Sequence, residues 1–252
     1  MIFNTRKVVW QGILALLLMV LVGGFMFWFW TKQVAEVEEA VKAEIEGAYT
    51  LIEDVYVYGD IQSAKAGIIV YPGAKVDPMA YGTTAKQIAE KGYVVFVPQM
   101  FLNMAILSSD QASTIIDTYP QIDVWVVGGH SLGGVAAAQY IDMHPKKADG
   151  LFFWAAYPTE RTDFSQTDLP MLSIYAEKDG LTEIQDIEKS KKYMSPNSIY
   201  YEIIGGNHSQ FGAYGLQNKD HQADIPREKQ QSEIAEAMDN WLQREVLQEA
   251  RS

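Results

Sequence analysis

A serine, an aspartate and a histidine each follow an expected strand, in an order that nucleophilic catalysis can use. Ser131 lies in GGHSLGG at positions 128–134, directly after the apolar run 124–127. Asp179 follows the run 172–176, and His208 follows the run 200–204. A serine hydroxyl becomes a nucleophile when a neighbouring base takes its proton, and a carboxylate orients that base. The three positions therefore predict a Ser-His-Asp catalytic triad.

The glycines around the serine have three interpretations. The first interpretation is a glycine loop that binds phosphate. A Walker-type loop needs Gly-Lys-Ser or Gly-Lys-Thr, which this sequence lacks. A dinucleotide-binding loop needs G-x-G-x-x-G in the first strand–helix unit, whereas this motif lies in the middle of the chain and lacks that spacing. A plain turn between strand and helix is the second interpretation. The third is a nucleophile elbow, because positions 129–133 match G-x-S-x-G between an expected strand and an expected helix. Small neighbours let the strand and the helix pack closely around a strained serine, which favours the elbow.

The choice of base and acid is narrow, because the chain has 4 histidines. His130 neighbours the serine and is expected to point away from it. His221 lies in the same long loop as His208 and is the alternative base. Glu177 and Asp186 are the alternative acids.

An acyl-transfer site also needs N–H donors aimed at the oxyanion that develops on the substrate. The backbone N–H of Leu132, directly after the nucleophile, is expected to be one donor. The second is expected from the loop YPGAK at 71–75, where Gly73 lets the backbone turn and Ala74 presents its N–H. A simple Pro-Gly turn is the alternative interpretation of this loop.

Strand-like and helix-like stretches alternate along the chain. Runs such as GIIVY and VVFV are typical of parallel strands buried on both faces. The alternation predicts an α/β architecture, a mostly parallel sheet flanked by helices, in one domain at 48–252. We expect an extended stretch at 49–58, strands at 66–71, 93–98, 123–127, 150–155, 171–176 and 199–204, and helices at 80–91, 108–118, 132–144, 183–194 and 229–249.

The N-terminal part predicts a membrane anchor. Residues 8–30 carry no charge and end in FMFWFW, which is long enough to span a bilayer and unlike the cleavage site of a signal peptide. Arg6 and Lys7 precede this segment, so we expect 1–7 in the cytoplasm, 8–30 in the membrane and the rest outside. The acidic segment 31–47, with apolar residues at helical spacing, is expected to be a helical stalk.

The amino-acid composition argues against several classes of binding partner. The net charge of −12 argues against nucleic-acid binding. The chain has no cysteine, which excludes disulfides and thiolate metal sites. The histidines show no H-E-x-x-H spacing, and we expect neither a metal nor a cofactor. Oligomeric state is left open.

These motifs resemble the α/β-hydrolase superfamily from about residue 66 to the C-terminus. The likeness is carried by YPGAKVDPMAY, GGHSLGG, LFFWAAYP, LPMLSIYAEKDG and GGNHSQFGAYG, and it looks closest to a bacterial membrane-anchored branch related in layout to dienelactone hydrolases. The resemblance implies Ser131 as nucleophile, His208 as base and Asp179 as acid. Dienelactone hydrolases themselves use cysteine, so their lactone substrate is not carried over. No HGGG-type run precedes Lys75, unlike in many lipases.

Several side chains at or near strand ends are candidates to line an acyl pocket: Met100, Phe101, Trp154, Tyr157, Phe211 and Tyr214. Core packing is the alternative for each. The connection 156–170 is too short for a large lid, and 205–228 is long enough to act as one. We expect a membrane-anchored serine hydrolase that cleaves a small-molecule carboxylic ester or thioester through an acyl-enzyme. The alternatives are an acyltransferase that uses the same triad and a non-catalytic surface binding protein.

Overall fold

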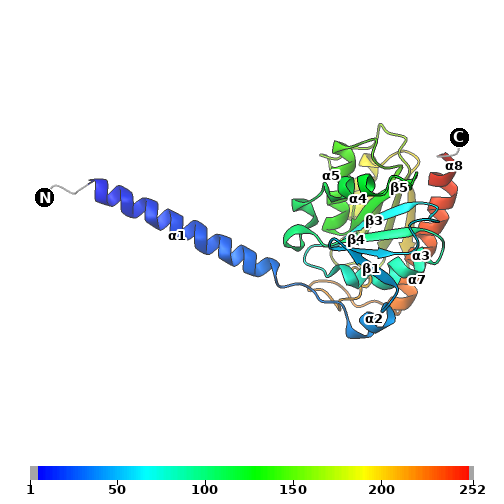
Figure 1. Ribbon diagram of the computed structural model, residues 1–252, viewed down its shortest axis with the longest axis horizontal. Coiled ribbons are helices and arrows are strands. Elements are labelled where there is room, and N and C mark those ends of the chain that lie inside the picture. The colour runs from blue at the N-terminus through cyan, green and yellow to red at the C-terminus, as the bar shows by residue number, and fades with distance from the viewer. Residues whose placement is uncertain (1–4, 250–252) are drawn as a thin grey trace.

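An eight-stranded sheet forms the centre of the structure, a computed structural model whose described part is residues 5–249 (Figure 1). The strand order is β1-β2-β4-β3-β5-β6-β7-β8. Strands β3 to β8 pair in parallel, whereas β1 and β2 form an antiparallel hairpin that adds to the β4 edge. The strands are β1 Tyr49–Ile52, β2 Val55–Tyr58, β3 Gly67–Tyr71, β4 Val94–Pro98, β5 Trp125–His130, β6 Gly150–Trp154, β7 Met171–Ala176 and β8 Ile199–Ile203.

The central strands are buried on both faces, as their continuous apolar runs predict. Every residue of β3, β4, β5, β6 and β7 is buried. Side chains alternate between the two faces of a strand, so this pattern requires cover on both sides of the sheet. Two separate apolar cores, one on each face, provide it.

Helices form the two outer layers. One face packs against α3 (Gly82–Ala89) and α7 (Arg227–Trp241), and the other against α4 (Gln111–Thr118) and α5 (Leu132–Met143). In α7 the buried residues Ile234, Met238 and Trp241 recur at helical spacing, which gives one apolar face. The remaining helical segments are α1 Thr5–Thr31, α2 Glu39–Glu44, η1 Pro78–Tyr81, η2 Phe101–Asn103, η3 Ala105–Leu107, α6 Ile184–Ser190, η4 Lys191–Tyr193, η5 Ser209–Phe211, η6 Leu242–Val246 and α8 Leu247–Glu249.

The expected mostly parallel sheet flanked by helices is confirmed, with differences at the element ends. The extended stretch expected at 49–58 is a hairpin, because Glu53 and Asp54 adopt positive φ values of 46° and 63° and reverse the chain. The helix expected at 183–194 is α-helical only to Ser190, and the one expected at 229–249 starts earlier and contains the irregular turn η6. The short segments η2 and η3 have no periodic pattern in the sequence.

The segment 31–47 is not a free helical stalk. Only Glu39–Glu44 forms a regular helix. Val37, Val41 and Ile45 are 3%, 0% and 0% exposed and belong to the core on the α3–α7 side. The expectation of a helical stalk is therefore wrong: these apolar side chains pack against the domain. The domain consequently begins before residue 48.

The long helix α1 projects away from the rest of the protein (Figure 1). Its stretch Lys7–Thr31 is long and apolar enough to cross a membrane, and the most apolar part of it has no buried residue. At about 1.5 Å per residue a helix of 27 residues is roughly 40 Å long. It is therefore a candidate transmembrane span. The first four residues of the expected cytoplasmic segment 1–7, and residues 250–252, lie outside the described part.

Candidate active site

Ser131 occupies a sharp turn between β5 and α5. Its backbone has φ 52° and ψ −123°, a conformation that is costly for a residue with a side chain and that is found mainly at functional sites. A Cβ atom on Gly129 or Gly133 would overlap the carbonyl oxygen of Tyr71 at the end of β3. Both positions therefore require glycine, and the close approach of β3 brings the loop after Tyr71 beside the serine.

His208 and Asp179 form a buried pair. Nδ1 of His208 lies 2.8 Å from Oδ2 of Asp179, and the two side chains are 1% and 0% exposed. The other carboxylate oxygen accepts the backbone N–H groups of Leu181 at 2.8 Å and Thr182 at 2.6 Å. Because Nδ1–H donates to the carboxylate, Nε2 carries the lone pair. This Nε2 is buried and has no hydrogen-bond partner among the described residues.

The alternative base and acids lie in other environments. The side chain of His221 is exposed, and its backbone carbonyl accepts Nδ2 of Asn207 at 2.7 Å. Glu177 accepts the backbone N–H of Gly205 at 2.9 Å. Asp186 lies on α6, 3.8 Å from Lys189. None of the three side chains is hydrogen-bonded to His208 within the part of the chain that the structure covers.

Asp220 connects the loops that carry Asp179 and His208. Its Oδ1 accepts the backbone N–H groups of Gly180 at 3.1 Å, His208 at 3.3 Å and His221 at 2.9 Å. Its Oδ2 accepts the N–H of Ser209 at 2.8 Å and its hydroxyl at 2.6 Å. One carboxylate thus fixes the position of His208 relative to the turn that follows Asp179. The sequence reasoning missed this residue.

Gln230 of α7 holds the loop that carries His208. Gln230 is fully buried; its side-chain amide accepts the N–H of Asn207 at 3.0 Å and donates to the carbonyl of Asn207 at 2.8 Å. Asn207 immediately precedes the base. A buried amide with both groups satisfied fixes a backbone segment, so the histidine is held from two sides.

His130 packs directly against His208. The centre of its ring lies 4.5 Å from that of His208 and 5.5 Å from that of Phe211, with the His130 and Phe211 rings nearly parallel at 14°. Oη of Tyr81 lies 2.9 Å from Nδ1 of His130 and accepts the N–H of Gly73 at 2.9 Å. When Nδ1 carries the lone pair of the neutral ring, the phenolic O–H donates to it. Burial, together with the neighbouring His208, lowers the pKa of His130 well below its usual value, which keeps the ring neutral.

The two expected oxyanion donors lie in segments that pack together. Leu132 is the first residue of α5, and its N–H has no acceptor among the described residues, as is usual in the first turn of a helix. The N–H of Ala74 likewise has no recorded acceptor in residues 5–249. On either side of it, Gly73 donates to Tyr81, and Lys75 donates to the carbonyl of Asn103 at 2.8 Å. The Ala74 donor is thus held between two anchored neighbours.

The candidate pocket residues divide into buried and accessible ones. Trp154 and Phe211 are both 0% exposed, so in this structure their side chains are part of the core and add no accessible lining. Met100 is nearly buried and its sulfur accepts the hydroxyl of Ser108 at 3.4 Å, whereas Phe101 on η2 is 64% exposed. Tyr157 and Tyr214 are half-buried on the loops that follow β6 and η5.

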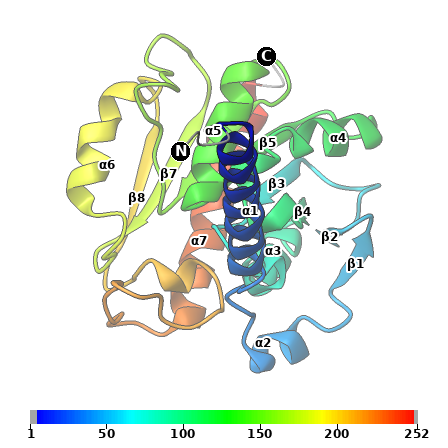
Figure 2. The same cartoon turned by 90° about the vertical axis from the view of Figure 1, so that its left-hand side faces the viewer.

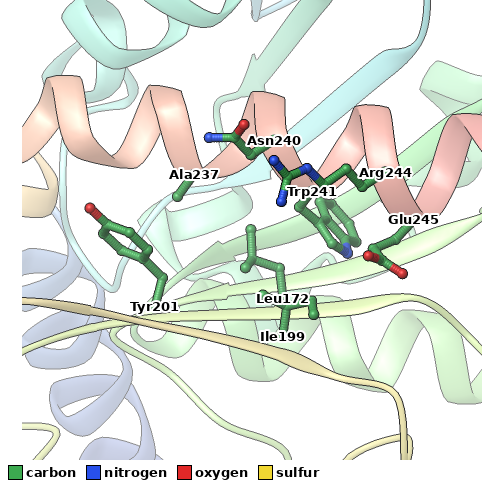
Figure 3. Close-up of a pocket in the computed structure, with 8 residues that line it drawn as sticks. All are labelled: Leu172, Ile199, Tyr201, Ala237, Asn240, Trp241, Arg244 and Glu245. Carbon is green, nitrogen blue, oxygen red and sulfur yellow. The ribbon is translucent and has the colours of Figure 1, made fainter.

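An apolar cavity lies away from Ser131, Asp179 and His208 (Figure 3). It is lined by α7, η6 and the first residues of β7 and β8: Leu172, Ile199, Tyr201, Ala237, Asn240, Trp241, Arg244 and Glu245. Parallel strands begin at the edge of the sheet opposite the one where they end, and the triad residues follow strand ends. The cavity is therefore unsuited to hold a substrate of Ser131. No cluster of three or more potential metal ligands occurs within residues 5–249.

Comparison with known proteins identifies similar sequences and folds. The sequence profile of the alpha/beta hydrolase family matches residues 67–232. No curated protein matches the sequence significantly. Solved structures with the same fold include a monoacylglycerol lipase from Paleococcus ferrophilus, with TM-score 0.54 and 12% identity over 75% of this chain and 97% of that one.

Two further solved structures have the same fold. One is MGS-MChE2, an alpha/beta hydrolase enzyme from the metagenome of lagoon sediments of Mar Chica, Morocco, with TM-score 0.54 and 13% identity over 77% of this chain and 97% of that one. The other is the esterase domain of a Rhodothermus marinus protein, with TM-score 0.56 and 12% identity over 75% and 92% of the two chains. At these identities the likeness describes the fold.

Proposed function

This chain belongs to the alpha/beta hydrolase family, and we propose that it hydrolyses a carboxylic ester or thioester with Ser131 as nucleophile, His208 as base and Asp179 as the acid that orients the base. The observation that carries this proposal is the buried 2.8 Å pair of His208 and Asp179. Nε2 of His208 has no hydrogen-bond partner among the described residues, and the centre of its ring lies 4.5 Å from that of His130, the residue before the strained elbow at Ser131. Such a pair is expected where a histidine must accept a proton at one nitrogen while the other stays protonated.

In the first step, Oγ of Ser131 attacks the acyl carbon and its proton moves to Nε2 of His208. The negative charge on the carbonyl oxygen is stabilised by the N–H groups of Leu132 and Ala74. The bond from the acyl carbon to the leaving oxygen or sulfur then breaks. The leaving group takes the proton from Nε2 and departs as an alcohol or thiol, and the acyl group remains on Ser131.

In the second step, water replaces the leaving group. His208 accepts a proton from the water as its oxygen attacks the acyl carbon, and the same two N–H groups stabilise the charge. The bond to Oγ of Ser131 breaks and Oγ regains a proton from Nε2. The products are a carboxylic acid and the free enzyme, so that one water is consumed for each ester cleaved.

A fluorophosphonate probe tests the nucleophile. We expect full-length protein in detergent micelles to be labelled at Ser131 alone, and Ser131→Ala to be neither labelled nor active towards a panel of ester chain lengths. Ser63→Ala is the control, because that serine is exposed, lies outside the site and donates to Asp60 at 2.7 Å. An adduct mapped to another serine, or no adduct on folded protein, would contradict the serine-hydrolase proposal.

The same assays separate the two alternative functions. If acyl groups pass to an added alcohol faster than to water, the protein is an acyltransferase that uses the same triad. If the protein binds esters without turnover and without labelling, it is a binding protein on a hydrolase scaffold. Neither alternative is favoured by a particular contact in the structure.

We further propose that α1 anchors the protein in the cell membrane, with the N-terminus in the cytoplasm and the catalytic domain outside. The uncharged stretch 8–30, which packs against no other part of the domain over most of its length, and the two basic residues that precede it, Arg6 and Lys7, support this orientation. Protease added to intact cells, with the cell wall permeabilised, is expected to degrade the domain. Complete protection would reverse the orientation, and release of a soluble form would indicate a cleaved signal sequence.

A further inference from the structure

The end of α1 contacts the same edge of the sheet that carries the triad. Nζ of Lys75 lies 4.1 Å from the centre of the Trp30 ring, and Nδ2 of Asn103 donates to the carbonyl of Thr31 at 2.9 Å. Lys75 follows β3 and Asn103 follows β4, so both contacts are made by loops at the carboxyl ends of parallel strands. Figure 2 looks along α1 and shows it in front of the domain, between α5 and α3.

The chain between α1 and the domain has little freedom. The N–H of Ala35 donates to the carbonyl of Lys75 at 2.7 Å, and the N–H of Asp77 donates back to the carbonyl of Ala35 at 3.0 Å. The N–H of Glu38 donates to the carbonyl of Ala213, in the loop after η5, at 2.8 Å. Because the backbone is paired with the domain within a few residues of the helix end, the end of α1 is held close to this edge of the domain.

The contact at Trp30 sets the distance between the oxyanion loop and the membrane. Tryptophan at the end of a membrane span lies at the level of the lipid headgroups. Lys75, whose ammonium covers the Trp30 ring, directly follows Ala74. An extended lysine side chain reaches roughly 6 Å, and neighbouring Cα atoms are about 3.8 Å apart. Ala74 therefore lies within roughly 15 Å of the headgroup level.

An exposed apolar segment lies on this edge beside α1. Residues 100–107, MFLNMAIL, include Phe101, Ile106 and Leu107, which are 64%, 37% and 50% exposed. Leu216, in the loop after η5, adds a side chain that is 56% exposed. Neighbouring exposed apolar side chains on a soluble domain mark a contact surface. Here the surface is continuous with a candidate membrane span, so lipid is the partner that its position favours.

We propose that the enzyme takes its substrate directly from the lipid bilayer: segment 100–107 inserts among the headgroups beside α1, and the substrate is a lipid that carries a long acyl chain in ester linkage. This inference rests on the proposed hydrolase function and adds the substrate class. A long acyl chain leaves a bilayer slowly because its transfer to water is unfavourable. A site held at headgroup depth receives the ester group while the chain is still shielded from water.

Activity on two substrates in the same sample tests the inference. Full-length protein is reconstituted in phosphatidylcholine vesicles that contain a long-chain fluorogenic ester, and a water-soluble short-chain ester is assayed in parallel. The double variant Ile106→Ser with Leu107→Ser is expected to lower the rate on the membrane ester about tenfold or more, with the rate on the soluble ester within twofold of wild type. The control is Met143→Ser with Ile199→Ser, which removes exposed apolar side chains at the opposite edge of the sheet.

Depth in the bilayer is measured without any need for activity. Because the chain has no cysteine, Leu107→Cys and Met143→Cys each introduce a single site for an environment-sensitive fluorophore. Nitroxide-labelled lipids are expected to quench the probe at position 107 and not the one at position 143. Equal weak quenching at both positions would overturn the inference. A second measurement uses iodide, a water-soluble quencher of the same fluorophore. If neither iodide nor the nitroxide lipids quench the probe at position 107, a protein partner or a second copy covers the segment, and the inference is overturned.

The outcomes distinguish this inference from the proposed function. If neither ester is cleaved and Ser131→Ala changes nothing, the hydrolase function fails, whereas the quenching result still reports whether the segment enters the bilayer. If the soluble ester is cleaved by Ser131 and the double serine variant keeps its full rate on the membrane ester, the hydrolase function stands and bilayer access is refuted.

Discussion

Asp220→Asn is expected to impair catalysis without touching the substrate. The substitution keeps the shape of the side chain but replaces one acceptor oxygen with a donor NH₂ group. With nitrogen at the Oδ2 position, the N–H of Ser209 faces another donor. With nitrogen at the Oδ1 position, the N–H groups of Gly180 and His208 face another donor instead. Either orientation leaves a backbone donor near the base unpaired, which costs about 1–3 kcal/mol of unfolding free energy.

The same change should loosen His208 relative to Asp179. Because a displacement of about 1 Å in a catalytic group can cost about 10²-fold in rate, we expect kcat to fall between roughly 10-fold and 100-fold. KM should change little, since Asp220 lies outside the expected path of the substrate. The rate of fluorophosphonate labelling at Ser131 should fall with kcat. Steady-state kinetics on a soluble ester and urea unfolding, both on full-length protein in micelles, measure these effects.

Asp224→Asn is the matched control in the same loop. It makes the same chemical change, but its carboxylate is 67% exposed and only faces Lys178 at 3.3 Å. A surface ion pair of this kind contributes about 0–1 kcal/mol, so kcat should stay near the wild-type value. If Asp220→Asn retains kcat within twofold of Asp224→Asn, the carboxylate does not position the base and the reasoning is refuted.

Three further predictions concern the histidines and the oxyanion loop. His208→Ala should lower kcat by about 10⁴-fold, as Ser131→Ala does, and the exposed His221→Ala should not; the reverse pattern in steady-state kinetics would identify His221 as the base. Tyr81→Phe removes the acceptor of the Gly73 N–H, so we expect about a tenfold loss in kcat with little change in KM and near-normal folding by circular dichroism; an unchanged kcat would exclude this support. The lowered pKa of His130 predicts a pH-dependent stability. Below the ordinary pKa of about 6.5, this histidine takes up a proton in the unfolded chain but not in the native protein, so the free energy of unfolding should fall by up to about 1.4 kcal/mol for each pH unit of acidification. In urea titrations at several pH values, His130→Gln should show a smaller pH dependence than the wild type, and an equal dependence would contradict this prediction.

The parts of the site that follow local patterns could be predicted from the sequence. Apolar runs located the parallel strands, and residues directly after them lie at the expected sheet edge. The Gly-x-Ser-x-Gly pattern indicated the elbow because Gly129 and Gly133 both lie against the carbonyl of Tyr71, where only a residue without a Cβ fits. These inferences need only strand order and side-chain size, which short stretches of sequence contain.

The supporting contacts could not be predicted, because each joins distant segments. Asp220 is one polar residue in a loop rich in them, and only the folded loop shows its five N–H and O–H donors. Tyr81 reaches His130 from the helical turn η1, 49 residues away along the chain. The one available signal was composition: His130 and Tyr81 are polar side chains in apolar surroundings, and buried polar groups require partners.

The docked segment 32–45 has a consequence for the order of folding. Arg227 forms an ion pair with Glu38 across 189 residues of sequence, and Val41 packs in the same core as Ile234 of α7. Segment 32–45 is the first part of the domain to be synthesised, and part of its packing therefore depends on α7, which is one of the last. Contacts of such long sequence separation form late. The side of this segment that packs with α7 therefore stays uncovered until synthesis is nearly finished, even though Ala35 and Ile45 can contact Asp77 and Gly82 earlier. Chains truncated before α7 should leave the apolar side chains of segment 32–45 exposed, and they should bind chaperones or aggregate. The domain is therefore completed only when α7 has been synthesised.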